Sequence, residues 1–258
     1  MAEHQIRFDD GVAYERMMGA WSRLAGGTFL DWIVPRPGLR WVDVGCGNGA
    51  FTELVVERCA PAEVHGIDPS EGQLKYARAR PATRIAEFRQ GDAMALPFPD
   101  NSFDLAVMAL VIFFVPDPAK GVAEMVRVVS PGGTVAAYAW DMAGGGFPLQ
   151  PVQAELLAMG FAPVRPPRSD ASKIDALQNL WTDAGLDSVE TRKIEVQRCN
   201  ERLPISKTFG RQPCWDRRLV RQLPLWWLVI GSSSKRECVH VCRQTVRGAS
   251  PTAHGQMR

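Results

Sequence analysis

Residues 40–50 read Arg-Trp-Val-Asp-Val-Gly-Cys-Gly-Asn-Gly-Ala, an apolar run that ends in a glycine-rich loop. The run predicts a buried strand that leads through the loop into a helix over about residues 50–59. The glycines let the backbone turn tightly and leave room for a ligand where side chains would collide. Because Gly45, Gly47 and Ala50 also fit the G-x-G-x-x-A spacing of dinucleotide sites, the loop alone does not identify the ligand.

Asp43 separates the candidate ligands, because it stands two places before the first glycine. The pyrophosphate of NAD, bound at the start of the following helix, would be repelled by a carboxylate so close by. S-adenosylmethionine has no phosphate and carries an ammonium and a sulfonium, both of which an acidic site favours. Asp43 therefore favours S-adenosylmethionine, with NAD as the alternative.

Strand and helix patterns alternate along the rest of the chain. Strands are expected over residues 63–67, 83–89, 103–110, 134–140 and 186–197. Helices are expected over residues 14–25, 28–34, 71–80, 119–129 and 172–184, and a loop rich in Gly and Pro over 141–170. This alternation predicts an α/β fold with a mostly parallel sheet that is covered on both faces.

Two further carboxylates come directly after predicted strands. Asp68 ends the strand at 63–67 and can accept hydrogen bonds from both hydroxyls of a ribose. Asp92 follows Gly91 and can accept a hydrogen bond from an adenine amino group. Both acids also have a structural interpretation, since Asp68 can cap a helix and Gly-Asp is common in turns. The ribose contact suits NAD as well as S-adenosylmethionine.

Four segments together resemble a known family. They are Val42-Asp-Val-Gly-Cys-Gly-Asn-Gly49, His65-Gly-Ile-Asp68, Gly91-Asp-Ala-Met-Ala-Leu-Pro-Phe-Pro-Asp-Asn-Ser-Phe-Asp104 and Arg127-Val-Val-Ser-Pro-Gly-Gly133. In this order they look like the class I S-adenosylmethionine-dependent methyltransferases. The resemblance is strongest to the large bacterial type 11 group, loosely related to the ubiquinone/menaquinone C-methyltransferases. It covers about residues 10–198.

The resemblance implies a Rossmann-like three-layer sandwich with strand order 3-2-1-4-5-7-6 and an antiparallel last strand. It also implies that the glycine loop lies under the methionine moiety, that Asp68 holds the ribose, and that Asp92 reads the adenine. Backbone near Met108 and Ala109 would complete the pocket, and an N-terminal helical lid over about residues 11–34 would close it. The expected cofactor-binding residues are Asp43, Gly45, Cys46, Gly47, Gly49, Asp68, Pro69, Asp92, Ala93 and Met108.

Four side chains are candidates for a lid or an acceptor site. Tyr14, Met18 and Trp21 recur at helical spacing near the N-terminus, and Phe113 follows the strand at 103–110. Burial in the core explains each of them about as well. No histidine stands in an obvious base position, so no catalytic residue is assigned. Cys46 is interpreted as a small residue that fills space in the glycine loop.

The composition of the 258 residues, 46% hydrophobic and 22% charged, fits a domain with a sizeable core. No long apolar run and no signal-like N-terminus occur, so we expect no membrane span and a cytoplasmic location. A small-molecule acceptor is expected, and no nucleic acid, because residues 1–198 lack a basic surface interleaved with aromatics. Cys238 and Cys242 have no properly spaced second pair, so no metal site is expected.

Residues 199–258 depart from the family pattern. They carry eleven Lys or Arg residues against three acids, together with four of the six cysteines. One hypothesis is a shift of the reading frame near Arg198, because one permissible coding of 199–210, moved by two bases, reads QRTITDFEDFW. The family places an acidic-aromatic segment of that kind there. The rival hypothesis is a poorly ordered basic tail that binds nucleic acid or anionic lipid.

The sequence thus predicts a methyltransferase domain over residues 1–198 and an atypical basic tail over 199–258. If the frame has shifted, the seventh strand is missing and the sheet exposes an edge. The expected reaction moves a methyl group from S-adenosylmethionine to a small molecule. The alternatives are an NAD-dependent oxidoreductase and a methyltransferase-like protein that binds the cofactor without turnover.

Overall fold

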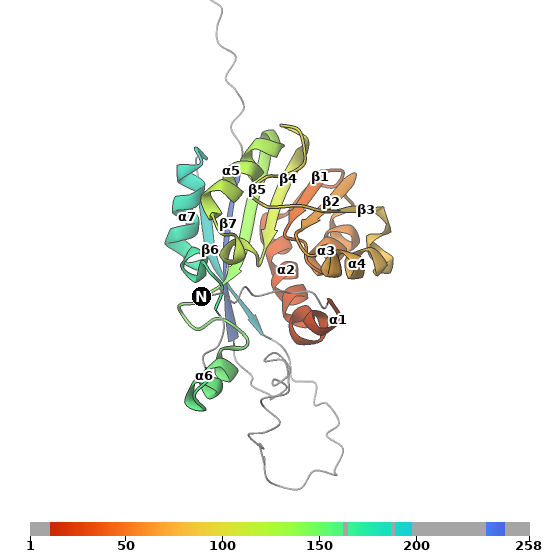
Figure 1. Cartoon of the computed structure of the whole chain (residues 1–258). Helices are drawn as coiled ribbons and strands as arrows, with labels where there is room; N and C mark the ends of the chain where they lie inside the picture. Colours follow the sequence, from red (N-terminus) through yellow and green to blue (C-terminus); the bar gives the residue numbers. More distant parts are fainter. Residues whose placement is uncertain (1–10, 162–164, 187–188, 198–235, 246–258) are drawn as a thin grey trace, which may run out of the picture.

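The computed structural model describes residues 11–161, 165–186, 189–197 and 236–245. Its strands are β1 (Arg40–Val44), β2 (Glu63–Asp68), β3 (Ala86–Gln90), β4 (Phe103–Ala109), β5 (Val129–Trp140), β6 (Glu190–Gln197) and β7 (Arg236–Thr245). They form one sheet in the order β3-β2-β1-β4-β5-β7-β6 (Figure 1). The first five strands pair in parallel, and β7 runs antiparallel to both β5 and β6. The strand order expected from the resemblance is confirmed.

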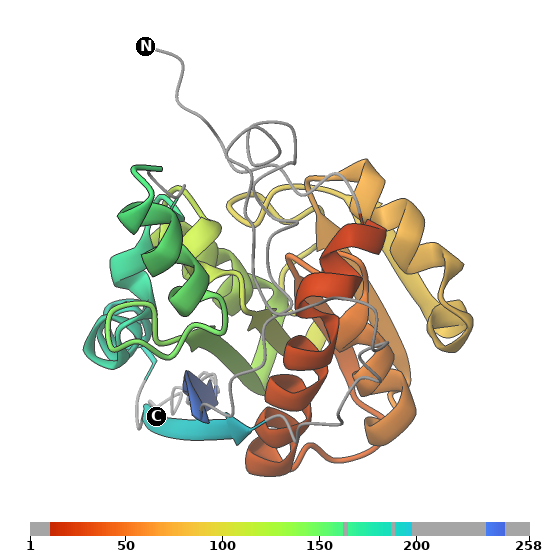
Figure 2. The same cartoon turned by 90° about the horizontal axis from the view of Figure 1, so that it is seen from below.

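Helices cover both faces of the sheet. They are α1 (Gly11–Tyr14), α2 (Ala20–Ile33), α3 (Ala50–Cys59), α4 (Glu71–Ala79), α5 (Pro118–Val128), α6 (Gln150–Ala158) and α7 (Ile174–Asp183). Short helical turns are η1 (Glu15–Gly19), η2 (Pro81–Ile85), η3 (Ile112–Phe114) and η4 (Ser169–Ser172). Figure 2 shows α1 to α4 on one side of the sheet and α5 and α7 on the other, whereas α6 lies beyond the end of the strands in Figure 1. The expected three-layer sandwich is therefore present.

The sequence explains where the central helices begin. Ser70 caps α4, since its hydroxyl accepts a hydrogen bond from the Gln73 N–H at 3.3 Å. Asp117 caps α5 in the same way through the Lys120 N–H at 3.2 Å, and a proline occupies the first turn. These caps satisfy N–H groups that a helix cannot bond internally. Both helices therefore start directly after the loops that follow β2 and β4.

The largest side chains of the core lie in the middle of the sheet and under α7. Trp41, Trp140, Tyr138 and Phe103 are each at most 2% exposed. Trp181 of α7 is fully buried, and its indole N–H donates to the Val135 carbonyl of β5 at 3.0 Å. Burying large apolar groups with their polar atoms satisfied stabilises the contact between this helix and the sheet.

The two predicted N-terminal helices form one helical segment, so that prediction is wrong. The segment runs through α1, the π-helical turn η1 and α2 without a break at Gly26-Gly27. A Cβ atom at Gly26 would lie only 2.9 Å from a methyl group of Leu54 in α3. Gly26 thus permits close packing of α2 on α3, and this contact outweighs the weak helix propensity of glycine. The segment extends from Gly11 to Ile33, and its role as a lid stays a prediction.

Three other predictions of local structure also differ from the fold. The expected loop over residues 141–170 contains α6, of which only Leu156 is buried. The strand expected from Thr83 begins at Ala86, because Pro81–Ile85 forms the 3₁₀ turn η2. β5 begins at Val129 and includes the Ser130-Pro-Gly-Gly133 turn expected before it. Each difference moves an element boundary or adds a short helix, and the order of the elements is unchanged.

The tail expected to lack a strand supplies β7, which lies between β5 and β6. The backbone of Val241, for example, is in register with Tyr138 of β5 and Arg192 of β6. A shifted reading frame was expected to remove the seventh strand, but the structure forms this strand over residues 236–245. The rest of the tail prediction lies outside the described residues. No helix in the described part of the chain is long and apolar enough to cross a membrane.

Candidate active site

The glycine loop lies at the carboxyl edge of the parallel strands, between β1 and β2. The N–H groups of Gly45 and Cys46 both donate to the Ile67 carbonyl, at 2.7 and 3.0 Å. Gly45, Gly47 and Gly49 all have positive φ angles, of 77°, 52° and 79°, which other residues rarely adopt. The sequence places these glycines because the strand must turn sharply into α3.

The three glycines face different neighbours. A Cβ atom at Gly45 would collide with Val111 at 2.5 Å, and one at Gly49 would lie 2.9 Å from Ala77. At Gly47 a Cβ atom would meet no atom within 4 Å. Gly45 and Gly49 thus permit packing against neighbouring elements, whereas Gly47 borders open space. Room for a ligand exists at the middle glycine of the loop.

Asp68 ends β2 beside the loop and is 9% exposed. Its Oδ2 atom accepts a hydrogen bond from the Gly47 N–H at 2.8 Å, and its Oδ1 atom accepts one from the Ser70 N–H at 2.9 Å. Burial raises the pKa of this carboxyl group, and the two backbone hydrogen bonds oppose the shift. Each oxygen has a second lone pair, so the carboxylate can still accept from two ribose hydroxyls. The free lone pairs of Asp68 therefore fit its predicted role in holding the ribose.

Asp43 lies on β1 directly below the loop and is 2% exposed. Its Oδ2 atom accepts a hydrogen bond from the Thr52 hydroxyl at 2.6 Å. Its Oδ1 atom is buried and has no hydrogen-bond partner among the described residues. Burial raises the pKa of Asp43 to about 7. A buried carboxylate oxygen without a partner is costly, and a cationic ligand nearby would reduce that cost.

Two tyrosines share the electrostatic environment of these acids. Burial raises the pKa of Tyr14 in α1, and the charge of Asp68 acts in the same direction. Burial also raises the pKa of Tyr138 in β5 well above its usual value, and the charge of Asp43 adds to the shift. Tyr14 was expected near the cofactor from its position in the lid. Tyr138 was missed, because an apolar strand gives no signal of which residue faces the site.

A partly buried ion-pair cluster links the N-terminal helical segment to the glycine loop, and the sequence did not predict it. Arg80 is 10% exposed; it donates to the Asn48 carbonyl at 2.7 Å and to a Glu53 carboxylate oxygen at 2.7 Å. It also pairs with Glu15 of η1, whose carboxylate accepts from the Asn48 side-chain amide at 2.8 Å. Glu53 pairs in turn with Arg23 of α2 at 2.5 Å. We call Glu15, Asn48, Glu53 and Arg80 the lid cluster.

The other predicted cofactor residues lie at the same edge with differing exposure. Asp92 is exposed, and its Oδ1 atom accepts from the Met94 N–H at 2.8 Å, as in an ordinary turn. Pro69 is exposed and Ala93 is half-buried. The Met108 side chain is fully buried and points toward Gly121 of α5, so only its backbone can face a ligand. The adenine-reading role of Asp92 stays a prediction.

Cys46 fills space in the loop, in agreement with its interpretation from the sequence. It is 6% exposed and packs with Leu74, Ala77 and Phe88 in a small apolar cluster. Burial raises the pKa of its thiol well above the usual value, and the charges of Asp43 and Asp68 add to the shift. A thiol that stays protonated is a poor nucleophile. The geometry therefore gives Cys46 a packing role.

Of the four candidate lid and acceptor residues, two are buried in the core and two are half-buried. Met18 and Phe113 are 4% and 3% exposed and belong to the hydrophobic core. Trp21 of α2 is half-buried and meets Trp140 at the end of β5 edge-on, with ring centroids 6.5 Å apart. Tyr14 is also half-buried. Tyr14 and Trp21 thus remain the candidates for contact with a ligand, while the structure favours packing for Met18 and Phe113.

The part of the chain that the structure describes places neither a histidine base nor a metal site at this edge of the sheet. His65 of β2 is 5% exposed and packs edge-on against Phe98 and Phe103, with Glu63 at its Nε2 atom. It therefore lies among aromatic rings and is no candidate base. Among the residues that the structure describes, no group of three or more His, Cys, Asp or Glu side chains is arranged to hold a metal ion.

Residues 42–137 match the model of a family described as a methyltransferase domain. The demethylmenaquinone methyltransferase of Desulfitobacterium hafniense (strain Y51) is 43% identical over 116 residues, which are 43% of this chain and 45% of that protein. The chloroplastic 2-methyl-6-phytyl-1,4-hydroquinone methyltransferase 2 of Oryza sativa subsp. japonica is 43% identical over 95 residues, 37% of this chain and 27% of that protein. The matched part thus spans less than half the length of either relative.

A solved structure shows the same fold over nearly the whole chain. The SAM-dependent methyltransferase from Aquifex aeolicus superposes with a TM-score of 0.60 at 18% sequence identity. The alignment covers 93% of this chain and 100% of that one. The likeness supports the Rossmann-like architecture, and the family model matches the segment that contains the glycine loop, Asp43, Asp68 and Asp92.

Proposed function

We propose that the protein transfers a methyl group from S-adenosylmethionine to a small molecule, because residues 42–137 match the model of a methyltransferase domain. The observation that carries this proposal is the pair of buried carboxylates, Asp43 and Asp68, on either side of a glycine loop. A dinucleotide would bring its pyrophosphate toward Asp43, whereas a sulfonium and an ammonium are attracted by it. The unpartnered Oδ1 atom of Asp43 strengthens this preference.

The residues of the chain bind and orient the cofactor. Asp68 would accept hydrogen bonds from the ribose hydroxyls through the lone pairs that Gly47 and Ser70 leave free. Gly47 leaves the space into which the methionine part would extend, and Asp43 would stabilise its positive charge. Tyr14 and the lid helix would cover the site and exclude water. Asp92 would contact the adenine once its turn opens toward the ligand.

When bound, S-adenosylmethionine supplies a methyl group that is electrophilic because it is attached to a positively charged sulfur. Asp43 and Asp68 would hold the donor in place while the acceptor takes the methyl group and the bonding electron pair stays on sulfur. An acceptor that is protonated at the reacting atom also loses a proton. Holding both molecules in line can supply roughly 7–11 kcal/mol, so catalysis does not require a named base.

The acceptor class follows from the relatives. Two of them are named for a demethylated menaquinone and for a phytyl hydroquinone, both of which carry an oxygen-substituted ring. We propose an aromatic acceptor of this kind, activated by a ring oxygen. The proposal of this acceptor class for the present chain rests on sequence matches that span less than half the length of each relative. A cytoplasmic location would suit such an enzyme and is proposed on the same basis.

A methyl-transfer assay tests the proposal. The full chain would be incubated with S-adenosylmethionine carrying an isotopically labelled methyl group and with a panel of benzo- and naphthohydroquinones. We expect label in at least one acceptor, and none with Asp68→Ala. If the cofactor binds but no member of the panel or of a wider small-molecule set is methylated, the alternative of a binding protein without turnover is correct. Oxidation or reduction of an acceptor with NAD would instead support the oxidoreductase.

A further inference from the structure

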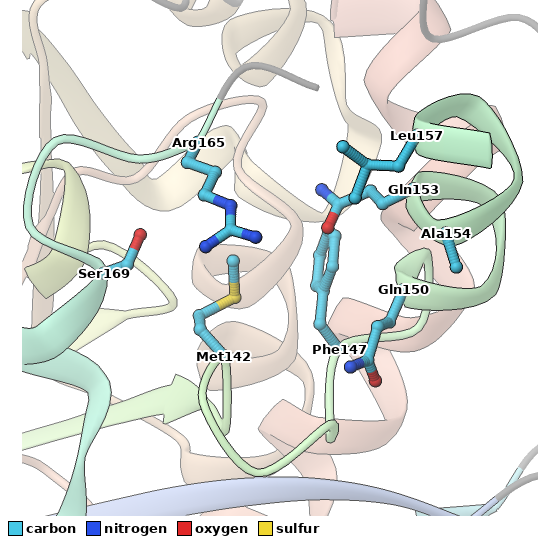
Figure 3. A pocket seen from close by; sticks show the side chains of 8 residues that line it. All are labelled: Met142, Phe147, Gln150, Gln153, Ala154, Leu157, Arg165 and Ser169. Atoms are coloured by element: carbon cyan, nitrogen blue, oxygen red, sulfur yellow. The ribbon is translucent and has the colours of Figure 1, made fainter. Parts of the chain in front are cut away.

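A pocket of about 180 Å³ lies beyond the end of β5, between the loop that follows this strand and α6 (Figure 3). Met142, Phe147 and Leu157 supply its apolar wall. Gln153 and Arg165 bring polar groups to the same space, and Figure 3 shows the guanidinium of Arg165 directed toward Met142 and Phe147. The pocket therefore combines a flat apolar surface with a cation.

The pocket stands at the same edge of the sheet as the glycine loop. β5 pairs with β4, and β4 pairs with β1, so the ends of β5 and β1 are two strand spacings apart, roughly 10 Å. Met142 follows the end of β5 by two residues. The wall that carries Arg165 and Ser169 is held to the loop after β4, since the Arg168 N–H donates to the Phe113 carbonyl at 3.1 Å. The pocket therefore opens beyond the same ends of the strands at which the glycine loop lies.

The charge of the pocket is not neutralised by the protein. No acidic residue belongs to the lining, and Arg165 forms no ion pair with any residue that the structure describes. Arg40, Arg80 and Arg127 are paired with carboxylates, whereas the exposed Arg165 reaches the pocket without such a partner among the described residues. An unpaired guanidinium above an apolar wall attracts an anion that is part of a flat, apolar molecule.

We propose that this pocket binds an aromatic ring bearing an anionic oxygen group, with Arg165 as the counter-ion and Phe147 and Met142 against the ring. The proposal rests on the proposed function, because it takes the pocket to be the acceptor site. A cavity of about 150 Å³ accepts benzene in another protein, so the volume here suits one ring with a small substituent. The anion is either a ring carboxylate or an ionised ring hydroxyl.

The test measures binding of three small probes by calorimetry, with the full chain saturated with S-adenosylhomocysteine. The probes are benzoate, 4-nitrophenolate and the uncharged benzamide. Arg165→Met removes the charge and keeps the length of the side chain, and Arg165→Lys keeps the charge without the planar fork. Arg84→Met, at an exposed arginine in η2, the turn that precedes β3, is the matched control.

We expect at least one anionic probe to bind, to bind about tenfold more weakly to Arg165→Met, and to bind unchanged to Arg84→Met. Benzoate alone would identify the carboxylate source, and nitrophenolate alone the ring hydroxyl. The proposal is overturned if neither anion binds, if benzamide binds as tightly as the anions, or if Arg165→Met has no effect. Titration of the unaltered chain with S-adenosylmethionine tells the two proposals apart. Absence of cofactor binding refutes the proposed function, whereas cofactor binding without binding of either anion refutes the pocket proposal alone.

Discussion

Asp43 is the residue whose ionisation should control cofactor affinity. Its pKa of about 7, raised by burial, means that the carboxyl group is protonated in about half of the molecules near neutral pH. A positively charged ligand binds the ionised form better, so its binding releases a proton. The affinity should therefore fall as the pH falls below about 7, approaching tenfold for each unit.

Calorimetric titrations with S-adenosylmethionine between about pH 5.5 and about pH 7 measure this dependence, because the ligand's own amino and carboxyl groups change little in that range. Asp43→Asn should bind more weakly at neutral pH and show little dependence on pH. An affinity of the unaltered protein that is constant over this range would mean that Asp43 does not face the positive charge.

Gly47 should be required for binding more than for folding. It has a φ angle of 52°, and a Cβ atom there would meet no protein atom within 4 Å. Gly47→Ala should lower the free energy of unfolding by only about 1 kcal/mol, the cost of a left-handed alanine. Its methyl group would project into the ligand space, so affinity for S-adenosylmethionine should fall at least tenfold.

Gly38 supplies the control for this prediction. It has a φ angle of 80° and equally open surroundings, but it lies in the turn before β1, at the opposite end of that strand. Gly38→Ala should show the same loss of stability by denaturant unfolding and no loss of affinity. Equal affinities of the two variants would place the ligand somewhere other than beside Gly47.

The structure brings together the two acids that the sequence singled out, whereas several groups around them were not predicted. The cofactor-binding role of these acids stays a prediction. Asp43 and Asp68 could be predicted because a carboxylate at the end of a buried strand has few structural uses. Arg80 and Tyr138 could not, since the residues that they contact come from elements far apart in the chain. Asp92 still fits both the adenine-binding and the turn interpretation, because its carboxylate accepts a hydrogen bond from the Met94 N–H at the predicted turn.

At the level of elements, the lid cluster should couple the N-terminal helix to the glycine loop. Arg80 is held between Glu15 of η1, Glu53 of α3 and the Asn48 carbonyl of the loop. Arg80→Met leaves the partly buried Glu15 carboxylate without an ion-pair partner and Glu53 with Arg23 alone, so we expect a loss of about 2 kcal/mol in the free energy of unfolding. The affinity for S-adenosylmethionine should also fall, since the loop and the lid lose a common partner.

Denaturant unfolding, together with a cofactor titration, measures both effects. Arg89→Met is the control, because the Arg89–Glu87 pair is half-exposed on both sides and surface pairs contribute little. It should change the free energy of unfolding by less than about 1 kcal/mol. Similar losses in the two variants would show that the lid cluster does not hold these elements together.

Element boundaries were harder to predict than element order. The helix pattern was interrupted at Gly26-Gly27, and only the contact of Gly26 with α3 explains why the helix continues. α6 was missed because it is largely exposed and lacks an apolar stripe, so the sequence carries no helical period there. Strands β1, β2 and β4 were predicted nearly to their ends, because fully buried parallel strands are continuous apolar runs.

On the scale of the whole molecule, the composition of the tail concealed a strand. Residues 236–245 include Val239 and Val241 in alternation with other side chains, a pattern typical of a strand. The many arginines and cysteines of the tail depart from the family pattern, so no strand was predicted there. The strand pairs with both β5 and β6. Whether the reading frame shifts near Arg198 stays a hypothesis, which the nucleotide sequence of the gene would settle.

A proline in β7 tests whether this part of the tail belongs to the folded domain. Val241 lies in a central strand, where a proline removes a backbone N–H donor and clashes with the neighbouring strand. Val241→Pro should lower the free energy of unfolding by about 3 kcal/mol or more, measured by denaturant or thermal unfolding. Val241→Ala keeps the N–H and should cost clearly less. Equal stabilities of the two variants would mean that the sheet does not depend on β7.

The central claim is that the edge formed by β1, β2 and the glycine loop binds S-adenosylmethionine. Calorimetric titration of the full chain with S-adenosylmethionine and, separately, with NAD tests it most directly. We predict binding of S-adenosylmethionine alone, lost in Asp68→Ala and retained in the exposed-site control Arg89→Met. Binding of NAD alone, or binding of S-adenosylmethionine that survives Asp68→Ala unchanged, would contradict the account.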